Sequence, residues 1–317
     1  MASAGTVLAI DDQLSSLEAM ADALTPLGFE VLQAQDGETG LALARERRPD
    51  VILLDVMMPG MDGYEVCRRL KADEETSLLP VVFLTGLDSR EAKLRGLQAG
   101  ATDFLTKPFS LVELGVRVRN LASFHRLTQE LDDAEKMLFA VARAVEARDE
   151  STGEHCERLS QLAARLADHM GLGAEAANTL RRAGYLHDIG KIAVPDSVLL
   201  KPARLDETEW TVMRAHVEIG VSICSPLRSL RAVLPVIRHH HERRDGTGYP
   251  DGLSGDTVPE LAQVFQVVDV YDALTNDRPY RPAMTPEEAI GTLARETERG
   301  WWNPRVVAAF SSMIGGV

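Results

Sequence analysis

The chain has 317 residues, of which 45% are hydrophobic. It exceeds an ordinary domain of about 100–200 residues, and we expect two domains with separate cores. The formal net charge of −14 disfavours non-specific binding to nucleic acid polymers or to anionic membranes, so an anionic substrate would need metal ions or clustered Arg and Lys.

The hydropathy pattern shows no sign of export or membrane insertion. The first residues lead directly into a short apolar segment that ends at Asp11-Asp12, without the basic start and long apolar core of a signal peptide. No apolar run approaches the roughly 18 residues that span a bilayer. We therefore expect a cytoplasmic location. The cysteines are far apart and in no Cys-x-x-Cys spacing, which predicts reduced, buried side chains: Cys67, Cys156 and Cys224.

From Thr6 to about Asn120, apolar runs typical of strands alternate with amphipathic stretches. The runs are Thr6–Ile10, Glu30–Ala34, Val51–Leu54, Val81–Leu84 and Asp103–Leu105. Five such alternations predict an α/β domain of the doubly wound, flavodoxin-like class, with a five-stranded parallel sheet covered by helices on both faces. In that architecture the binding crevice lies at the carboxyl ends of the strands.

Polar residues follow four of these runs, at the expected crevice: Asp11, Asp12, Asp55, Thr85 and Lys107. Carboxylates that converge there repel one another unless a cation lies between them, and Mg²⁺ prefers oxygen ligands. With Mg²⁺ bound, Asp55 can attack a phosphoryl group, while Lys107 neutralises charge and Thr85 donates a hydrogen bond. A single Asp at a strand end could instead cap the following helix. The full set of five positions favours phosphoryl transfer.

These positions resemble the receiver domain of response regulators. The matching features are Asp11-Asp12, Asp55 with the segment MMPGMDG at 57–63, Thr85, and Lys107-Pro108. The resemblance implies that Asp55 is the phosphoacceptor for a sensor histidine kinase, with Mg²⁺ held by Asp11 and Asp12. It also implies a cis Lys107–Pro108 bond and a switch in which Thr85 moves toward the phosphoryl group and Phe104 changes rotamer. We assign residues 1–122 to the receiver domain.

A stretch without proline continues from Pro108 to Pro195. Within it, apolar residues recur in steps of three and four: Phe124, Leu127, Leu131, Ala134, Leu138, Val141 and Val145. This spacing predicts a connecting helix, which we assign to residues 123–145. The pattern lasts only about three heptads, so two alternatives stay open: a helix packed on its own domain, or a parallel coiled coil that forms a homodimer. In both alternatives the connecting helix could transmit a change at Phe104 to the second domain.

The second domain, residues 146–317, shows helical periodicity and no alternating strand pattern, so we predict an all-α fold. It contains seven of the chain's eight histidines. One histidine on an apolar helix is more often a core residue than a ligand, and a triple-histidine run can be a solvated helix end. Several His and Asp from separate helices of one bundle can instead gather around metals. Imidazole and carboxylate without thiolate suit Fe, Mn, Zn or Ni.

Two motifs around these histidines resemble the HD-GYP phosphodiesterases, whose HD-type domain is helical. They are HDIGK at 187–191 and HHERRDGTGYP at 240–250, and the match continues through 269–275 and 277–281. The resemblance implies two divalent metals, with Fe or Mn favoured and Zn or Ni as alternatives. One metal would be held by His155, His187, Asp188 and Asp269. The second would be held by Asp188, His216, His240 and His241.

The resemblance also assigns residues to catalysis and substrate binding. Asp188 bridges the two metals, an arrangement suited to attack of water on a phosphodiester. Lys191 matches the position that contacts the scissile phosphate. Three further positions match substrate contacts, although a structural ion pair is an alternative for the arginines: Tyr249, Arg278 and Arg281. Three histidines match no ligand position: His125, His169 and His239.

The implied substrate is cyclic di-GMP, although the spacing does not separate it from another cyclic dinucleotide such as a mixed GMP–AMP ring. Some family members carry a Glu for a third metal where this chain has Ser151, so we expect two metals, and mainly pGpG rather than GMP as product. One rival is an HD hydrolase of linear nucleotides, which Gly248-Tyr249-Pro250 disfavours. Another is a phosphorylation-gated interaction or sensor protein with an inert hydrolase, which the complete ligand set and Lys191 disfavour.

Overall fold

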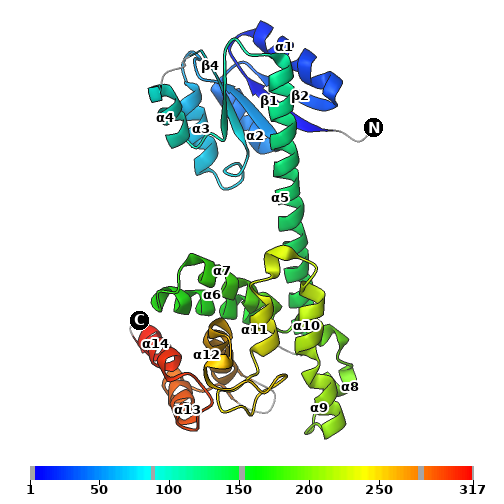
Figure 1. Cartoon of the computed structure of the whole chain (residues 1–317), viewed down its shortest axis with the longest axis vertical. Coiled ribbons are helices and arrows are strands. Elements are labelled where there is room, and N and C mark those ends of the chain that lie inside the picture. Colours follow the sequence, from blue (N-terminus) through cyan, green and yellow to red (C-terminus); the bar gives the residue numbers. More distant parts are fainter. Residues whose placement is uncertain (1–3, 87–89, 150–153, 278–281, 316–317) are drawn as a thin grey trace. The chain divides into compact units, whose positions relative to one another are not determined.

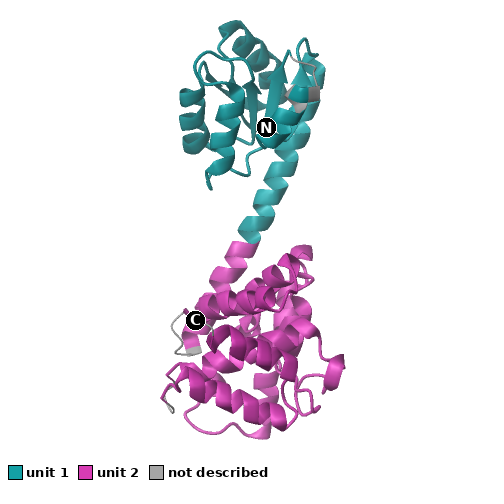
Figure 2. Ribbon diagram, turned by 90° about the vertical axis from the view of Figure 1, so that its left-hand side faces the viewer, with its two compact units in different colours: residues 1–134 teal, residues 135–317 magenta. Residues whose placement is uncertain are grey.

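The computed structural model describes residues 4–86, 90–149, 154–277 and 282–315. The chain divides into two compact units, residues 1–134 and 135–317, which are coloured separately in Figure 2. Within the described residues, we find no helix with both the length and the apolar character needed to cross a membrane. The expected cytoplasmic location stays a prediction.

Strands and helices alternate in the first unit (Figure 1). The strands are β1 (Gly5–Ile10), β2 (Phe29–Ala34), β3 (Val51–Asp55), β4 (Val81–Thr85) and β5 (Asp103–Thr106). They form one parallel sheet in the order β2-β1-β3-β4-β5. The predicted doubly wound sheet is confirmed, and each predicted run agrees with a strand to within one residue at either end.

Helices cover both faces of this sheet. They are α1 (Leu14–Leu24), the short 3₁₀ helix η1 (Thr25–Leu27), α2 (Gly37–Arg47), α3 (Gly63–Ala72), α4 (Arg90–Gln98) and α5 (Leu111–Glu146). Successive side chains of a strand point to opposite faces. In β1, Val7 and Ala9 therefore pack with α1 and the first turns of α5, while Leu8 and Ile10 pack with α2 and α3. Apolar layers thus cover both faces of the sheet, and polar residues lie at the edge where the strands have their carboxyl ends.

The second unit is helical, as predicted; its described residues contain one isolated β-bridge, Asp245 with Ser254. The α-helices after α5 are α6 (Glu154–His169), α7 (Ala174–Leu186), α8 (Asp196–Leu199), α9 (Glu207–Arg214), α10 (His216–Cys224), α11 (Leu234–His239), α12 (Glu260–Thr275), α13 (Pro286–Glu298) and α14 (Pro304–Gly315). The 3₁₀ helices are η2 (Ala147–Asp149), η3 (Ile189–Ala193), η4 (Arg228–Leu230) and η5 (Gly255–Thr257). The core is built mainly from α6, α7, α11, α12, α13 and α14.

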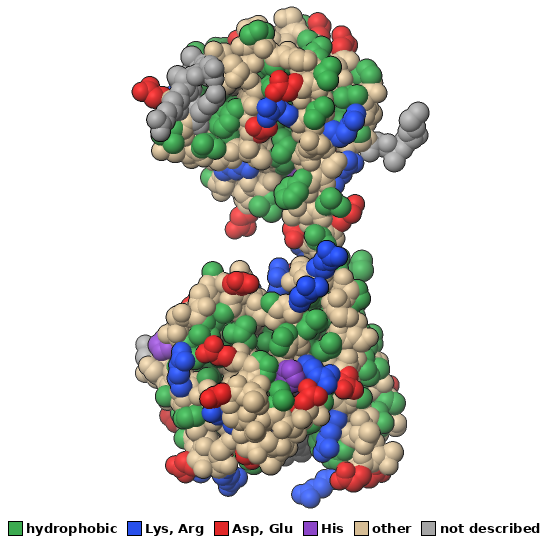
Figure 3. Space-filling view, viewed as in Figure 1, with side chains coloured by type: hydrophobic (Ala, Val, Ile, Leu, Met, Phe, Trp, Pro, Cys, Tyr) green, Lys and Arg blue, Asp and Glu red, His purple; other side chains and the backbone are tan. Residues whose placement is uncertain are grey.

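The predicted connecting helix is the later part of α5, which is one helix from Leu111 to Glu146. Its first turns pack beneath the sheet, and Ala142 near its other end packs into the core of the second unit. Between them, Phe124, Leu127 and Leu131 are 73%, 60% and 49% exposed, and hydrophobic side chains reach the surface of this helix in Figure 3. These three side chains of the seam are therefore exposed on the single chain, and the coiled-coil homodimer stays a prediction.

Candidate functional site

An acidic cluster lies at the carboxyl ends of β1 and β3. Asp11, Asp12 and Asp55 each offer an oxygen, and these atoms lie within 4.8 Å of one another. Lys107, which follows β5, donates from Nζ to Asp11 Oδ2 and to Asp55 Oδ1, both at 2.9 Å. Thr85 is buried at the end of β4, the strand beside β3. The sheet thus brings the predicted phosphorylation residues to one edge.

Electrostatic repulsion in this cluster favours a bound cation. Burial raises the pKa of the Asp55 carboxyl, and the charges of Asp11 and Asp12 raise it further, against the opposing effect of Lys107. Burial also works against the charge on Lys107, but its hydrogen bonds to Asp11 and Asp55 outweigh it and raise the pKa of the ammonium. One ammonium faces three carboxylates, so the residues fit a hard, oxygen-liganded Mg²⁺.

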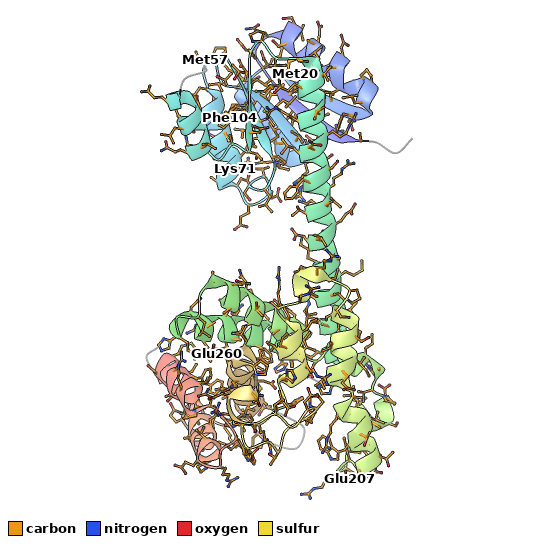
Figure 4. All side chains as sticks on the ribbon, viewed as in Figure 1. Met20, Met57, Lys71, Phe104, Glu207 and Glu260 are labelled. Atoms are coloured by element: carbon orange, nitrogen blue, oxygen red, sulfur yellow. The ribbon has the colours of Figure 1, made fainter. Side chains whose placement is uncertain are left out.

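Phe104 lies on β5 (Figure 4) and is half-buried, with its ring centroid 5.9 Å from that of Phe83. Its ring fills the space beside α4, because a Cβ added at Gly96 would lie 2.4 Å from the Phe104 ring. The Lys107–Pro108 peptide bond is cis, as the resemblance implied. Phe104 therefore has neighbours on α4 and on β4, the strand that ends at Thr85.

Two groups of metal-ligand side chains lie in the second unit. Each offers ligand atoms within 4.8 Å of one another; the first contains His155, His187 and Asp269, and the second contains Asp188, His216, His240 and His241. Asp188 lies close to both groups, because its Oδ2 is 3.3 Å from His187 Nε2 and its Oδ1 is 3.2 Å from His216 Nε2. The structure therefore brings together all seven residues that the resemblance names as ligands.

Five separate helices position these side chains. His155 lies in the first turn of α6, His187 and Asp188 follow α7, and His216 begins α10. His240 and His241 follow α11, and Asp269 lies within α12. Close packing makes this possible, since a Cβ added at Gly190 in η3 would lie 1.9 Å from the His216 carbonyl oxygen. Glycine at 190 therefore allows Asp188 and His216 to meet.

Backbone carbonyls fix the tautomers of two ligand histidines. His216 Nδ1 donates to Met213 O at 2.7 Å, and His240 Nδ1 donates to Ile237 O at 2.9 Å. Each ring therefore turns an Nε2 lone pair toward the cluster. These two Nε2 atoms, both ring nitrogens of His187 and Asp188 Oδ1 are buried, and no described residue hydrogen-bonds to them. A buried polar atom without a partner destabilises the fold by about 1–3 kcal/mol. Metal ions bound to these atoms would remove that cost, so the donor set fits bound metal ions.

The charges in this cluster also suit metal binding. Burial lowers the pKa of His240 and His241, which keeps their rings neutral. Burial opposes the charge on Asp188, but Lys191 and His187 outweigh it and hold the pKa of its carboxyl well below the usual range. At His187, Asp188 outweighs burial and raises the pKa to about 9. His240 and His241 as neutral rings and Asp188 as a carboxylate are thus in the forms that would bind metals.

Charged and aromatic groups line the edge of the second group. Lys191 Nζ lies 2.8 Å from Asp188 Oδ2. The Tyr249 ring stacks on His241 with centroids 4.8 Å apart, and the Arg214 guanidinium carbon lies 5.6 Å from the Tyr249 centroid. These groups suit a phosphate and the face of a base. Arg278, Arg281 and Ser151 lie outside the described residues.

Two supporting carboxylates were not assigned a role from sequence. Asp272 accepts from His155 Nδ1 at 2.5 Å, and Glu242, fully buried, accepts from the backbone N–H groups of Asp251 and Leu253 at 2.7 and 3.0 Å. Glu242 therefore holds the loop that contains Tyr249. A signal for Asp272 was available, because it lies three residues after Asp269 and so on the same side of a helix.

Comparisons with known proteins give the same two parts. The response regulator receiver domain matches residues 7–119, and the HD domain matches residues 139–306. The cyclic di-GMP phosphodiesterase response regulator RpfG of Xanthomonas campestris pv. campestris is 35% identical, over 96% of this chain and 86% of the relative. The cyclic di-GMP phosphodiesterase of Thermotoga maritima is 34% identical, over 96% and 89%. The 3'3'-cGAMP-specific phosphodiesterase 2 of Vibrio cholerae is 40% identical, over 56% and 34%.

Gly190→Ala is expected to destabilise the second unit by about 3 kcal/mol, because the added Cβ forces η3 and α10 apart. Thermal unfolding of the metal-free protein, followed by circular dichroism, measures the effect. Gly291→Ala in α13 is the matched control, since its nearest contact would be an ordinary 3.5 Å and a helical alanine is favourable. Equal melting temperatures for the two variants would refute the close packing at Gly190.

Proposed function

Because the chain belongs to the response regulators in which a receiver domain is joined to an HD domain, we propose that it hydrolyses a cyclic dinucleotide under the control of aspartyl phosphorylation. Cyclic di-GMP is the proposed substrate, since two relatives that match nearly the whole chain carry it in their names. The observation that carries the proposal is the pair of His and Asp groups around Asp188, with buried ring nitrogens to which no described residue hydrogen-bonds.

The seven ligand candidates divide between two metal positions. His155, His187, Asp188 and Asp269 would hold the first metal, and Asp188, His216, His240 and His241 the second. Fe or Mn is favoured, with Zn or Ni as alternatives, because imidazole and carboxylate supply the donors. Such a pair supplies Lewis acidity and an activated water for phosphodiester cleavage. The carboxylate of Asp188 would be shared by both positions.

The side chains beside the metals would hold the substrate. The Lys191 ammonium, 2.8 Å from Asp188, lies where it can neutralise a phosphate oxygen next to the reacting bond. Tyr249 offers a ring face to a guanine, and the nearby Arg214 adds positive charge for an anionic ligand. Arg278 and Arg281 stay proposed contacts from the motif. Together these groups would orient a ring whose two phosphates are negatively charged.

In the receiver domain, Asp55 would accept a phosphoryl group from a sensor histidine kinase while Asp11 and Asp12 hold Mg²⁺. The Lys107 ammonium already donates a hydrogen bond to Asp55 and would neutralise negative charge on the phosphoryl oxygens. Thr85 and Phe104 would serve as the switch. The exposed apolar residues of α5 support a parallel homodimer through that helix.

The Vibrio relative named for 3'3'-cGAMP makes a mixed ring the second candidate substrate. Tyr249 can stack on either purine, so its ring does not select between them. An assay with both nucleotides, on metal-analysed protein with and without phosphorylation, measures each kcat/KM. A higher value for cyclic di-GMP supports the proposal, and a higher value for the mixed ring would replace the substrate. Metal-loaded protein that cleaves neither would favour the sensor alternative.

Asp55→Asn is expected to abolish labelling by a small-molecule phosphoryl donor, because an amide cannot form the acyl phosphate. Labelling is followed by intact-protein mass spectrometry, with circular dichroism as the check on folding. Asp22→Asn, at an exposed position on α1, is the control and should be labelled as the wild type is. Persistent labelling of the Asp55 variant at another aspartate would show that the phosphoacceptor is misassigned.

Asp188→Ala is expected to remove metal and to lower activity by at least about 100-fold, since its loss leaves two cations facing each other. Elemental analysis and the nucleotide assay measure the two effects. His239→Ala is the control, because the ring nitrogens of this neighbouring histidine contact Pro235 O and Asp251 instead. Full metal content with normal turnover in the Asp188 variant would contradict the ligand assignment.

The main product is expected to be pGpG, because Ser151 offers no carboxylate for a third cation. Opening the ring requires one attack on a phosphodiester held by Lys191 and the metals. Cleavage of pGpG is harder, since its terminal phosphate adds negative charge that a third cation would neutralise. A chromatographic time course tests this, and GMP that forms as fast as substrate disappears would contradict it. Ser151→Glu should raise metal content or speed the second cleavage.

A further inference from the structure

Arg148, in η2 just after the end of α5, binds η3, the 3₁₀ helix that contains Lys191, and the residues that follow it. Its Nη1 atom donates to Lys191 O at 3.3 Å and to Ile192 O at 3.5 Å. Its Nη2 atom donates to Val194 O at 3.1 Å and to Asp196 Oδ1 at 2.6 Å. One guanidinium thus contacts three backbone carbonyls of a short segment, including the carbonyl of Lys191 itself.

Packing holds the first half of η3 better than the second. Ile189 and Gly190 are buried, and the close approach of α10 leaves no room for a Cβ at Gly190. By contrast, Ile192 is 49% exposed, and Ala193 is exposed as well. A 3₁₀ helix has poorer hydrogen-bond geometry than an α-helix, so its exposed end gains most from additional donors. Arg148 supplies such donors at this end.

The backbone carbonyls carry more of this interaction than the ion pair with Asp196. The Asp196 carboxylate is 70% exposed, and an exposed ion pair contributes little. The last carbonyls of a helix lack partners within it and carry a partial negative charge, which a guanidinium satisfies. The planar guanidinium also has five N–H groups in fixed directions, so it sets the orientation of the groups that it contacts. Arg148 therefore fixes the backbone from which the Lys191 side chain extends.

We propose that Arg148 is a positioning residue for Lys191, an assignment that rests on the phosphodiesterase function proposed above. The Lys191 ammonium lies 2.8 Å from Asp188 Oδ2, where it would neutralise charge on a phosphate oxygen as the bond breaks. A displacement of about 1 Å at such a group can lower a rate about 100-fold, so the position of its backbone matters. Because η2 directly follows α5, Arg148 also joins the end of that helix to η3.

Hydrogen exchange in Arg148→Gln tests the contact without relying on activity. The Lys191 N–H donates to Asp188 O and the Val194 N–H donates to Lys191 O, and both amides should exchange at least about fivefold faster when η3 loses its support. Mass spectrometry of peptides that span η3 measures the effect. Arg181→Gln is the matched control, because it removes the same charge from an exposed arginine of α7 whose guanidinium donates within its own helix. Unchanged exchange in a folded Arg148→Gln variant would overturn the contact.

The kinetic test uses the full-length, metal-loaded protein and the cyclic dinucleotide that the wild type cleaves faster. Arg148→Gln is expected to keep about two metals per chain and to lower kcat at least about tenfold with KM changed less than about threefold, because the misplaced charge acts mainly in the transition state. Arg148→Lys keeps a cation that can donate to the same carbonyls and should recover part of the loss. Asp196→Asn leaves the carbonyl contacts in place and should match the wild type, as should Arg181→Gln.

A double variant shows whether Arg148 acts through Lys191. In a Lys191→Ala background, adding Arg148→Gln should lower kcat less than about twofold, because the group that it positions is already absent. A further loss as large as in the wild-type background, a loss of metal in Arg148→Gln, or a normal kcat despite faster exchange would each overturn the positioning role. A wild-type, metal-loaded protein that cleaves no cyclic dinucleotide would overturn the proposed function instead, and the exchange measurement would still decide whether Arg148 holds η3.

Discussion

The Asp188 carboxylate lies between two groups of histidines, and the candidate metal site of the second unit depends on this arrangement. Its Oδ2 lies 3.3 Å from His187 Nε2 and its Oδ1 3.2 Å from His216 Nε2, so one negative charge faces histidines of both groups in a buried space. Burial alone would raise the pKa of this carboxyl, but Lys191 and His187 reverse the effect. The protein thereby keeps a charge at the centre of a helical core where an isolated charge would be too costly.

Around this centre, hydrogen bonds orient the ligands. Backbone carbonyls hold Nδ1 of His216 and His240, while Asp272 holds Nδ1 of His155. In a neutral ring each of these contacts places the proton on Nδ1 and leaves Nε2 as the nitrogen that can bind a metal, and such hydrogen bonds raise the basicity of a metal ligand. The scaffold thus supplies a donor set with fixed tautomers before any ion binds.

The receiver domain also brings like charges together, at the edge of a parallel sheet instead of in a helical core. There, parallel strands bring three carboxylates to one edge, and Lys107 neutralises part of their charge. The site is open enough for Asp12 to be exposed, whereas His187 and His216 in the second unit are almost fully buried. Asp55, the proposed phosphoacceptor, is itself only 5% exposed, so this site opens to the surface at Asp12.

The amino-acid sequence was enough to predict the five strands and the helical class of the second unit. It also contains the motifs whose resemblance to a known family names the seven ligand candidates, and strand alternation, helical spacing and contiguous motifs are all local patterns. The tertiary structure was needed to show which residues support those ligands. The contact of Asp272 with His155 joins residues 117 positions apart, and the contact of Arg148 with the Lys191 carbonyl joins residues 43 positions apart. It also showed that α5 is one helix with an exposed apolar stretch, since local spacing cannot say which side chains find a partner.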